Sequence, residues 1–337
     1  MADLFNTVYG RGLIRELKNS VHRPYLVVTM EDLWPRFADE FDAGLAGPLL
    51  VGSLERDDLD RTVAGLPRCE AVIGLGGGQA LDVAKYVAWT RRLPLFQVPT
   101  AMSVNAAWAH RAAVRTGGVV RYVAWAVPEA VYVDFDVVRS APPDMNRSGV
   151  GDILCYHTGH WDWKMARDLG RTEPQWPYDE ELVAEAQVAL RRVIDHADDI
   201  HEVNDRGIRA LAESLRWGGA AFHNAGWNPR HIEGAEHFVF YSLEYITNRP
   251  FVHGQIVCLG VLLVSALQGN EPEMIKDVIE RIGVPYHPEQ MGVTWDQVAE
   301  ALRQLPAAVT RGDLWYTVAS ERPVTDEYIA RMREWLA

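Results

Sequence analysis

One carboxylate and two imidazole side chains stand where the sequence favours a metal site. Asp152 ends the sequence GVGD, His237 ends GAEH, and His253 lies in VHGQ directly before an apolar helix. A carboxylate with two imidazoles suits a divalent ion that keeps an open position for substrate or water, and such an ion acts as a Lewis acid on a hydroxyl or carbonyl oxygen. None of the pairs has the HxxxH spacing, and each histidine taken alone is explained more simply as a capped or core residue.

Four further histidines compete for the same role. His157 falls five residues after Asp152, so its side chain can point towards the same site. His223 and His231 lie in a stretch rich in Gly, Asn and Pro that we expect to form a loop, and loops over a cleft often carry substrate contacts. For each of the four, His160 included, a packed or solvated histidine is the simpler interpretation.

A strand, the loop GLGGGQ at residues 74–79 and a helix make up the strongest local motif. Glycines let the backbone approach a ligand closely, and the N–H groups at the start of the next helix favour a phosphate. We therefore expect phosphate binding here, although a plain tight turn also favours glycine. The dinucleotide fingerprint GxGxxG is not met, because Gln79 stands where the last glycine belongs. Asp82 either flanks this site or is simply a first-turn acid favoured by the helix dipole.

The secondary structure that the sequence predicts around these residues changes along the chain. Up to about residue 134, short apolar runs alternate with amphipathic stretches, which predicts a parallel sheet with crossover helices. Two apolar runs flank Thr116-Gly117-Gly118 and predict a hairpin. The expected strands are residues 24–29, 48–51, 71–75, 95–99 and 130–134, and the expected helices are residues 31–41, 58–66 and 80–89.

Helical patterns dominate after Pro142-Pro143-Asp144. The sequence thus predicts two domains, residues 1–147 with an α/β fold and residues 148–337 with helices only, and a length of 337 residues fits two domains. The clearest helices of the second domain are expected at residues 180–197, 205–217, 232–245, 254–268, 272–282, 295–305 and 325–335.

Composition excludes several classes of protein. Hydrophobic residues make up 48% of the chain, which is too many for a disordered protein. A formal net charge of −13 argues against a nucleic-acid binder, and no stretch is apolar over the roughly 18 residues that a membrane span needs. Cys69, Cys155 and Cys258 are far apart and fit a reducing cytosol. Because the N-terminus does not look like a secretory signal, we expect a cytoplasmic protein.

The motifs together resemble the superfamily of iron-containing alcohol dehydrogenases, glycerol and glycerol-1-phosphate dehydrogenases and dehydroquinate synthases. GGGQALDVAK at residues 76–85 looks like the family's GGGSxxDxAK, and VPTAMS at residues 98–103 looks like its (V/I)PTxxS. GVGD, GAEH and VHGQ look like the segments that supply a metal carboxylate and two metal histidines. The resemblance spans about residues 22–265. It is nearest to glycerol-1-phosphate dehydrogenase, whose DWKLA segment resembles Asp162-Trp163-Lys164.

The resemblance implies an α/β nucleotide-binding domain, with a parallel sheet and crossover helices, followed by an all-α metal-binding domain. It implies NAD or NADP as the cofactor and one divalent metal, Zn²⁺ or Fe²⁺, held by Asp152, His237 and His253. Its members are dimers or larger rings, so we expect a homo-oligomer. The residues expected to bind the cofactor, with the glycines at the pyrophosphate, are Gly76, Gly77, Gly78, Gln79, Asp82, Thr100 and Ser103.

Two positions depart from the relatives. Asn105 stands where the glycerol and glycerol-1-phosphate enzymes usually carry an Asp that contacts substrate hydroxyls, and Tyr241 stands where a second histidine often follows the first. These changes predict a pocket that is lined differently. We take Asn105, His157 and Arg230 as candidate catalytic residues that contact the substrate, an alcohol or polyol with or without a phosphate.

The leading hypothesis is a metal-dependent NAD(P)-linked dehydrogenase that transfers hydride to or from a secondary alcohol. The alternative is a dehydroquinate synthase-like, cyclitol-forming lyase that uses NAD transiently. Against the lyase, residues 106–111 lack the lysine-containing GGKxxxN segment of that branch, which also has Glu at the position of Asp152. A non-catalytic relative is disfavoured because the metal triad is present. Glu31 either bonds the ribose 2′-hydroxyl of NAD or is a surface acid of the next helix.

Overall fold

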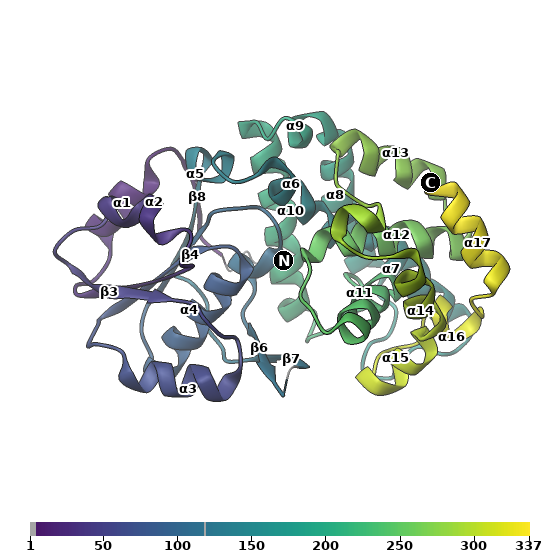
Figure 1. Cartoon of the computed structure of the whole chain (residues 1–337), viewed down its shortest axis with the longest axis horizontal. Helices are drawn as coiled ribbons and strands as arrows, with labels where there is room; N and C mark the ends of the chain where they lie inside the picture. Colours follow the sequence, from purple (N-terminus) through teal and green to yellow (C-terminus); the bar gives the residue numbers. More distant parts are fainter. Residues whose placement is uncertain (1–4, 118) are drawn as a thin grey trace. The chain divides into compact units, whose positions relative to one another are not determined.

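A six-stranded parallel sheet forms the centre of the N-terminal part of the chain (Figure 1). The computed structural model describes residues 5–117 and 119–337. The strands lie in the order β1-β8-β5-β4-β2-β3, and every pair of neighbours is parallel. The bounds are β1 Thr7–Gly10, β2 Tyr25–Thr29, β3 Leu45–Leu50, β4 Ala71–Gly76, β5 Leu95–Pro99 and β8 Ala130–Asp134.

Two further strands form the predicted hairpin. β6 (Ala112–Thr116) and β7 (Val119–Val123) pair antiparallel as a separate two-stranded sheet. Gly118, which belongs to the predicted turn, lies outside the described residues. The α/β parallel-sheet fold expected for this part of the chain is therefore confirmed. The sequence patterns missed only β1, a short strand that pairs with β8 at the edge of the sheet.

Helices of unequal length connect the strands. They are α1 Leu13–Ser20, α2 Trp34–Phe37, α3 Arg56–Gly65, α4 Gly78–Arg91 and α5 Phe135–Arg139, with the 3-10 helices η1 Ala38–Glu40 and η2 Asn105–Trp108. The helix expected over residues 31–41 is wrong in length, because only α2 and η1 form there. Phe37, at φ −124° and ψ −5°, leaves the helical region, so the chain tightens into the 3-10 turn.

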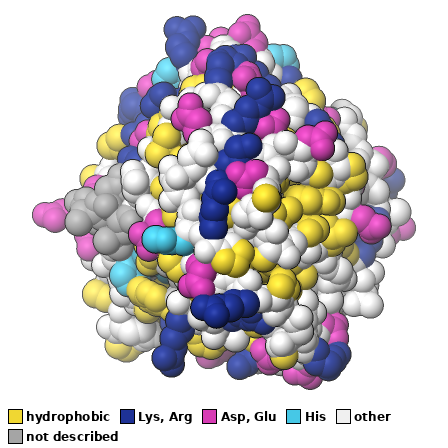
Figure 2. Space-filling view, turned by 90° about the vertical axis from the view of Figure 1, so that its left-hand side faces the viewer, with side chains coloured by type: hydrophobic (Ala, Val, Ile, Leu, Met, Phe, Trp, Pro, Cys, Tyr) yellow, Lys and Arg dark blue, Asp and Glu magenta, His cyan; other side chains and the backbone are white. Residues whose placement is uncertain are grey.

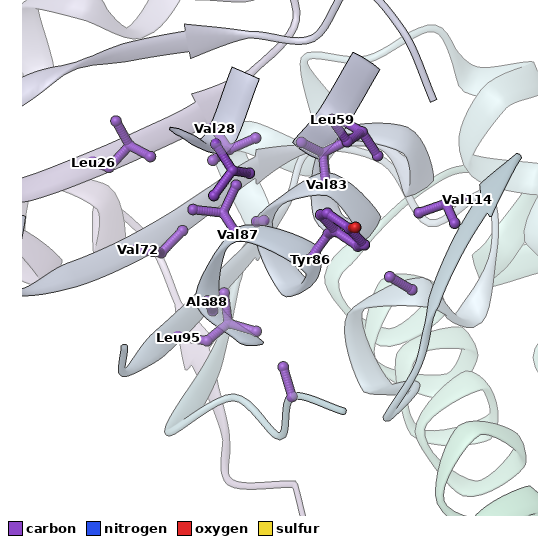
Figure 3. Close-up of a cluster of buried hydrophobic side chains, with 14 of the residues drawn as sticks. Leu26, Val28, Leu59, Val72, Val83, Tyr86, Val87, Ala88, Leu95 and Val114 are labelled. Carbon is purple, nitrogen blue, oxygen red and sulfur yellow. The ribbon is translucent and has the colours of Figure 1, made fainter. Parts of the chain in front are cut away.

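The sheet carries a hydrophobic core on each face, as alternation of side chains along a strand requires. Leu26 and Val28 of β2 belong to one buried cluster with Val83 and Val87 of α4, and Figure 3 shows this cluster. Tyr25 and Val27, the alternate residues of β2, belong to the opposite cluster. β2 is therefore buried on both faces, which is typical of a central strand in a parallel sheet.

Contacts divide the chain into two compact units. Unit 1 runs to Pro142 and includes Gly219–Ala221, and unit 2 is Pro143–Gly218 with Phe222–Ala337. The division falls in the Pro142-Pro143-Asp144 sequence, where the composition changes. Among the described residues, unit 2 contains helices and turns but no strand. Both signs of charge appear on the face shown in Figure 2, with Asp and Glu lying among Lys and Arg.

The helices of unit 2 bear out the mostly helical character expected for it. Their bounds are α6 Pro143–Arg147, η3 Ser148–Val150, α7 Gly151–Asp168, α8 Glu180–Asp195, α9 Ala197–His201, α10 Asp205–Asn224, α11 Ala235–Thr247, α12 His253–Gln268, α13 Pro272–Ile282, η4 Pro288–Met291, α14 Trp295–Arg303, α15 Leu305–Gly312, α16 Val318–Glu321 and α17 Asp326–Trp335. The single helix expected over residues 295–305 ends at Arg303, and Pro306 occupies the first turn of the next helix. No helix in the described ranges is both long enough and apolar enough to cross a membrane.

α12 packs against both α7 and α11, and glycines make the close approach possible. A Cβ added to Gly151 of α7 would lie 2.5 Å from the carbonyl oxygen of Gly254 in α12. A Cβ added to Gly260 of α12 would lie 2.5 Å from the carbonyl oxygen of Glu236 in α11. These contacts leave no room for a side chain, so the backbones of α7 and α11 lie directly against that of α12.

Candidate active site

Asp152, His237 and His253 come together at the start of three helices. Asp152 is the second residue of α7, His237 the third of α11 and His253 the first of α12. One ligand atom from each lies within 4.8 Å of the others, and His253 Nε2 stands 3.0 Å from Asp152 Oδ1. Two ligands about 2.1 Å from a common tetrahedral ion stand about 3.4 Å apart, so the three side chains fit a single divalent ion with little movement.

The charges around the cluster favour a cation. Burial alone lowers the pKa of His237, but the carboxylates of Glu233, Glu236 and Asp152 outweigh it and raise this pKa to about 9. Burial also raises the pKa of Glu233. These buried carboxylates stabilise positive charge beside them, and a bound divalent ion would supply that charge.

A second group of possible ligands, Cys155, Glu236 and His237, is less suitable for a metal. The Cys155 thiol donates to the carbonyl of Ile232 at 3.0 Å, and burial raises its pKa well above the ordinary value. A protonated thiol is a poor metal ligand. Glu236 Oε1 accepts a hydrogen bond from His237 Nδ1 at 3.0 Å, which leaves His237 Nε2 for the group with Asp152.

Tyr241 and Glu233 form a pair beside the histidines. Tyr241 Oη donates to Glu233 Oε2 at 3.2 Å, and the Tyr241 ring lies 6.2 Å from the His237 ring, centroid to centroid. Sequence reasoning noted Tyr241 only as a departure and did not select Glu233 or Glu236. Only the position of Glu236 directly before His237 could have drawn attention to it.

The glycine loop in unit 1 joins β4 to α4 with very little space around it. Gly76 has φ +157°, and an added Cβ would lie 2.7 Å from Ala80 Cβ. Gly77 precedes the helix without any side-chain cap, and an added Cβ there would meet no atom within 4 Å. A Cβ on Gly78 would touch Val104 at 3.0 Å. The helix N-terminus is therefore open at Gly77, where a phosphate can approach the backbone.

The other residues expected at the nucleotide lie around this loop. β2 has β3 on one side and β4 on the other, so the order of the strands reverses there, and ligands of such sheets bind at this point beyond the carboxyl ends of the strands. Glu31 is exposed and follows β2. The backbone N–H of Thr100 donates to the carbonyl of Gly76 at 3.0 Å, and Thr100 and Ser103 are both buried after β5. Gln79 is exposed in the first turn of α4.

The structure corrects one of the two interpretations of Asp82. The residue lies beyond the first turn of α4, and its Oδ1 is 2.6 Å from the Nζ of Lys85. Lys85 is fully buried and donates to the carbonyl of Arg111 at 2.7 Å. Burial raises the pKa of Asp82, and Lys85 partly offsets that increase. The carboxylate of Asp82 also accepts from the backbone N–H of Ala113, so with Lys85 it joins α4 to β6 and is not a first-turn acid.

The three candidate substrate residues lie in different places. Asn105 begins η2, directly after Val104, which borders the glycine loop. His157 Nε2 lies 2.8 Å from the carbonyl oxygen of Asn270, and His157 is not part of the cluster of ligand atoms. Arg230 is fully buried, donates to the carbonyl of Tyr316 and lies 3.6 Å from Glu173. Its surroundings indicate a role in the packing of unit 2.

The rival histidines are held in the core or on a helix. His160 Nε2 donates to the carbonyl of His231 at 2.9 Å, and Gln187 Nε2 donates to His160 Nδ1 at 2.8 Å. Burial lowers the pKa of His160 to about 4 and that of His231 to about 3. The prediction of a loop is wrong at His223, because this residue belongs to the last turn of α10.

Comparison with known proteins places the chain in a family. Residues 44–142 match the family model of iron-containing alcohol dehydrogenases. A glycerol-1-phosphate dehydrogenase [NAD(P)+] of Thermofilum pendens is 32% identical over 285 residues, which cover 82% of this chain and 81% of that protein. The chain belongs to the iron-containing alcohol dehydrogenase family. The enzyme of the same name from Methanosphaera stadtmanae is 29% identical and covers 83% of this chain and 78% of its own length.

Solved structures of other proteins share the fold. A probable glycerol dehydrogenase from Sinorhizobium meliloti 1021 has a TM-score of 0.73 at 18% identity and covers 98% of this chain and 96% of its own. A sulfoacetaldehyde reductase from Bifidobacterium kashiwanohense in complex with NAD+ has a TM-score of 0.69 at 18% identity and covers 100% and 98%. As a member of this family, the chain is an oxidoreductase, a dehydrogenase of the alcohol dehydrogenase type.

Proposed function

We propose that this dehydrogenase interconverts a glycerol-phosphate-like secondary alcohol and its ketone, using NAD or NADP and one divalent metal. The observation that carries the proposal is the meeting of Asp152, His237 and His253, which are far apart in sequence, at the start of three helices. The named function of the Thermofilum pendens relative supports the choice of substrate class.

Asp152, His237 and His253 would hold the metal, and the mixed carboxylate and imidazole set suits Zn²⁺ and Fe²⁺ alike. When bound, the metal supplies a Lewis acid for the substrate oxygen, and the nicotinamide supplies the hydride chemistry. Glu236 accepts the Nδ1–H of His237, so Nε2 would be the nitrogen of that ring that binds the metal.

Unit 1 provides the nucleotide contacts in this proposal. The backbone at Gly76, Gly77 and Gly78 would bind the pyrophosphate at the start of α4, whose positive end favours anions. Glu31 would accept a bond from the ribose 2′-hydroxyl and repel a 2′-phosphate, which favours NAD over NADP. We accordingly assign nucleotide binding to residues 1–147 and metal and substrate binding to residues 148–337.

Asn105 would contact a hydroxyl of the substrate through its side-chain amide. The amide both donates and accepts hydrogen bonds, whereas the Asp expected from the relatives only accepts when ionised.

We also propose that the protein is cytoplasmic and homo-oligomeric. The three cysteines are free and buried, which agrees with a reducing compartment.

The test is reduction of NAD+ and NADP+ by purified protein with glycerol 1-phosphate, its enantiomer glycerol 3-phosphate, glycerol and a set of cyclitols. We expect turnover with a glycerol phosphate, a preference for one enantiomer and faster reduction of NAD+ than of NADP+. Tight NAD binding without net reduction would support the cyclitol-forming lyase instead. Turnover of glycerol but of neither phosphate would refute the substrate class while leaving the dehydrogenase intact.

A further inference from the structure

A buried network of hydrogen bonds surrounds His237 on the side away from the candidate metal. Glu236 is fully buried and is the second residue of α11, directly before His237. Its Oε1 accepts from the His237 Nδ1–H at 3.0 Å and from the backbone N–H of Gly234 at 2.6 Å. Its Oε2 accepts from Thr158 Oγ1 at 2.6 Å. Both oxygens of this carboxylate are thus occupied.

The partner on the other helix is also buried. Thr158 lies in α7 with none of its surface exposed, one helical turn before Asp162. Asp162 Oδ2 accepts from the backbone N–H of Ala235 at 2.9 Å, and its Oδ1 accepts from the backbone N–H of Val318 at 2.8 Å. Asp162 therefore holds the start of α11 without touching the His237 ring.

The two carboxylates differ in what they hold. Asp162 binds the backbone at Ala235, whereas Glu236 binds the imidazole itself. A carboxylate that accepts from Nδ1–H fixes the tautomer and the rotation of the ring, and it makes the other nitrogen more basic. Because Glu236 occupies Nδ1, Nε2 is the nitrogen left to bind a metal with Asp152 and His253, and the orientation of the ring decides whether the three ligand atoms converge.

We propose that Glu236 is a positioning residue for His237, and that Thr158 holds Glu236 in place, a role that rests on the metal site proposed above. The carboxylate sets the tautomer that presents Nε2 to the metal. Asp162 serves as the matched structural residue, because it supports the same helix end through the backbone N–H of Ala235, and its other partners are the backbone of Val318 and the side chain of Gln268.

The test compares Glu236→Gln and Asp162→Asn in the full-length protein. The readouts are the dissociation constants for Zn²⁺ and Co²⁺, measured by chelator competition, the visible absorption spectrum of bound Co²⁺ and the melting temperature without metal. We expect E236Q to weaken metal binding about 10- to 100-fold and to shift the Co²⁺ bands. We expect D162N to lower the melting temperature while changing the dissociation constants less than about twofold.

Thr158→Val serves where E236Q does not fold. Loss of the hydroxyl should weaken metal binding by about threefold or more, and Thr158→Ser should restore it. The proposal is overturned if the unmodified protein binds metal but E236Q binds it equally well, or if D162N weakens binding as much as E236Q. If the unmodified protein binds neither ion, the metal site and this role of Glu236 fail together.

Discussion

The two units of this dehydrogenase build their candidate sites from different parts of the chain. In unit 1 the backbone provides the site, because three consecutive glycines stand between β4 and α4 and leave the helix N-terminus open at Gly77. In unit 2 side chains provide it, because Asp152, His237 and His253 come from three separate helices. The first site is local in sequence, and the second depends on how α7, α11 and α12 pack.

This difference decides how each site should respond to mutation. A backbone site tolerates a change of side chain wherever the added atoms do not reach the ligand. A side-chain site fails when one ligand atom is removed, even where the fold is unchanged. The four predictions that follow test this contrast.

The largest effect should come from a ligand of unit 2. His253→Ala removes one of three ligands at the first residue of α12, so it should abolish metal binding and lower kcat/KM by about 10³-fold or more. The melting temperature of the metal-free protein should hardly change, because His253 begins its helix. His22→Ala, at an exposed position of unit 1, is the control and should retain both metal and turnover. Full metal content in H253A would contradict the assignment.

Acid should destabilise unit 2 through its buried histidines. His160 and His231 have pKa values of about 4 and 3 in the fold, against about 6.5 when unfolded, so the unfolded chain binds more protons below pH 6.5. Their contribution to stability is complete above pH 6.5 and is lost as the pH falls towards 4 for His160 and towards 3 for His231. For His231 the loss at pH 4 is about 3 kcal/mol.

His231→Phe tests this acid effect in metal-free protein. The ring nitrogens of His231 have no hydrogen-bond partner among the described residues, so phenylalanine removes the titrating group without breaking a bond. Urea unfolding at pH 7 and pH 4.5 should show a smaller loss of stability for H231F than for the parent. An equal loss in both proteins would show that this histidine does not couple to acid unfolding.

A smaller effect should come from the backbone site of unit 1. Gly77→Ala places a Cβ where no protein atom lies within 4 Å, at the ordinary angles φ −79° and ψ −172°. The melting temperature should therefore stay the same, while NAD+ binding should weaken by about tenfold because the methyl group occupies the approach to the helix end. Gly65→Ala, at the last residue of α3, adds a methyl group into equally open space. G65A should leave NAD+ affinity unchanged, and equal weakening in both variants would refute phosphate binding at Gly77.

The smallest effect concerns the choice between NAD and NADP. Glu31→Ala removes an exposed charge after β2, so the preference of kcat/KM for NAD+ over NADP+ should fall by about three- to tenfold. Asp32→Ala changes the neighbouring exposed acid and is the matched control. A similar shift in both variants would indicate a general effect of charge rather than a contact with the ribose.

Local patterns predicted much of unit 1. The alternation of apolar runs and amphipathic stretches found five of the six sheet strands and the hairpin, because each depends on residues close in sequence. Asp82 is not the predicted first-turn acid, since its partners are Lys85 one turn on and the backbone of Ala113 in β6. The short edge strand β1 gave no signal, because its four residues are only half-buried.

Local sequence patterns predicted less of the candidate site in unit 2. Its helices were found, but spacing alone could not choose among the histidines of the chain, and the choice of His237 and His253 depended on the family resemblance. Arg230 was taken as a candidate substrate contact, yet the fold buries it against Glu173 and Tyr316. Glu236 was missed because its hydrogen bond to Thr158 joins two helices that are distant in sequence.

The metal site can be located by anomalous X-ray diffraction at the zinc and iron absorption edges, from crystals of protein produced with both metals in the medium. We expect one strong peak within about 2.0–2.3 Å of Asp152, of His237 Nε2 and of His253, and the edge that produces it identifies the metal. A peak beside Cys155 and Glu236 instead, or no peak near these residues, would contradict this expectation.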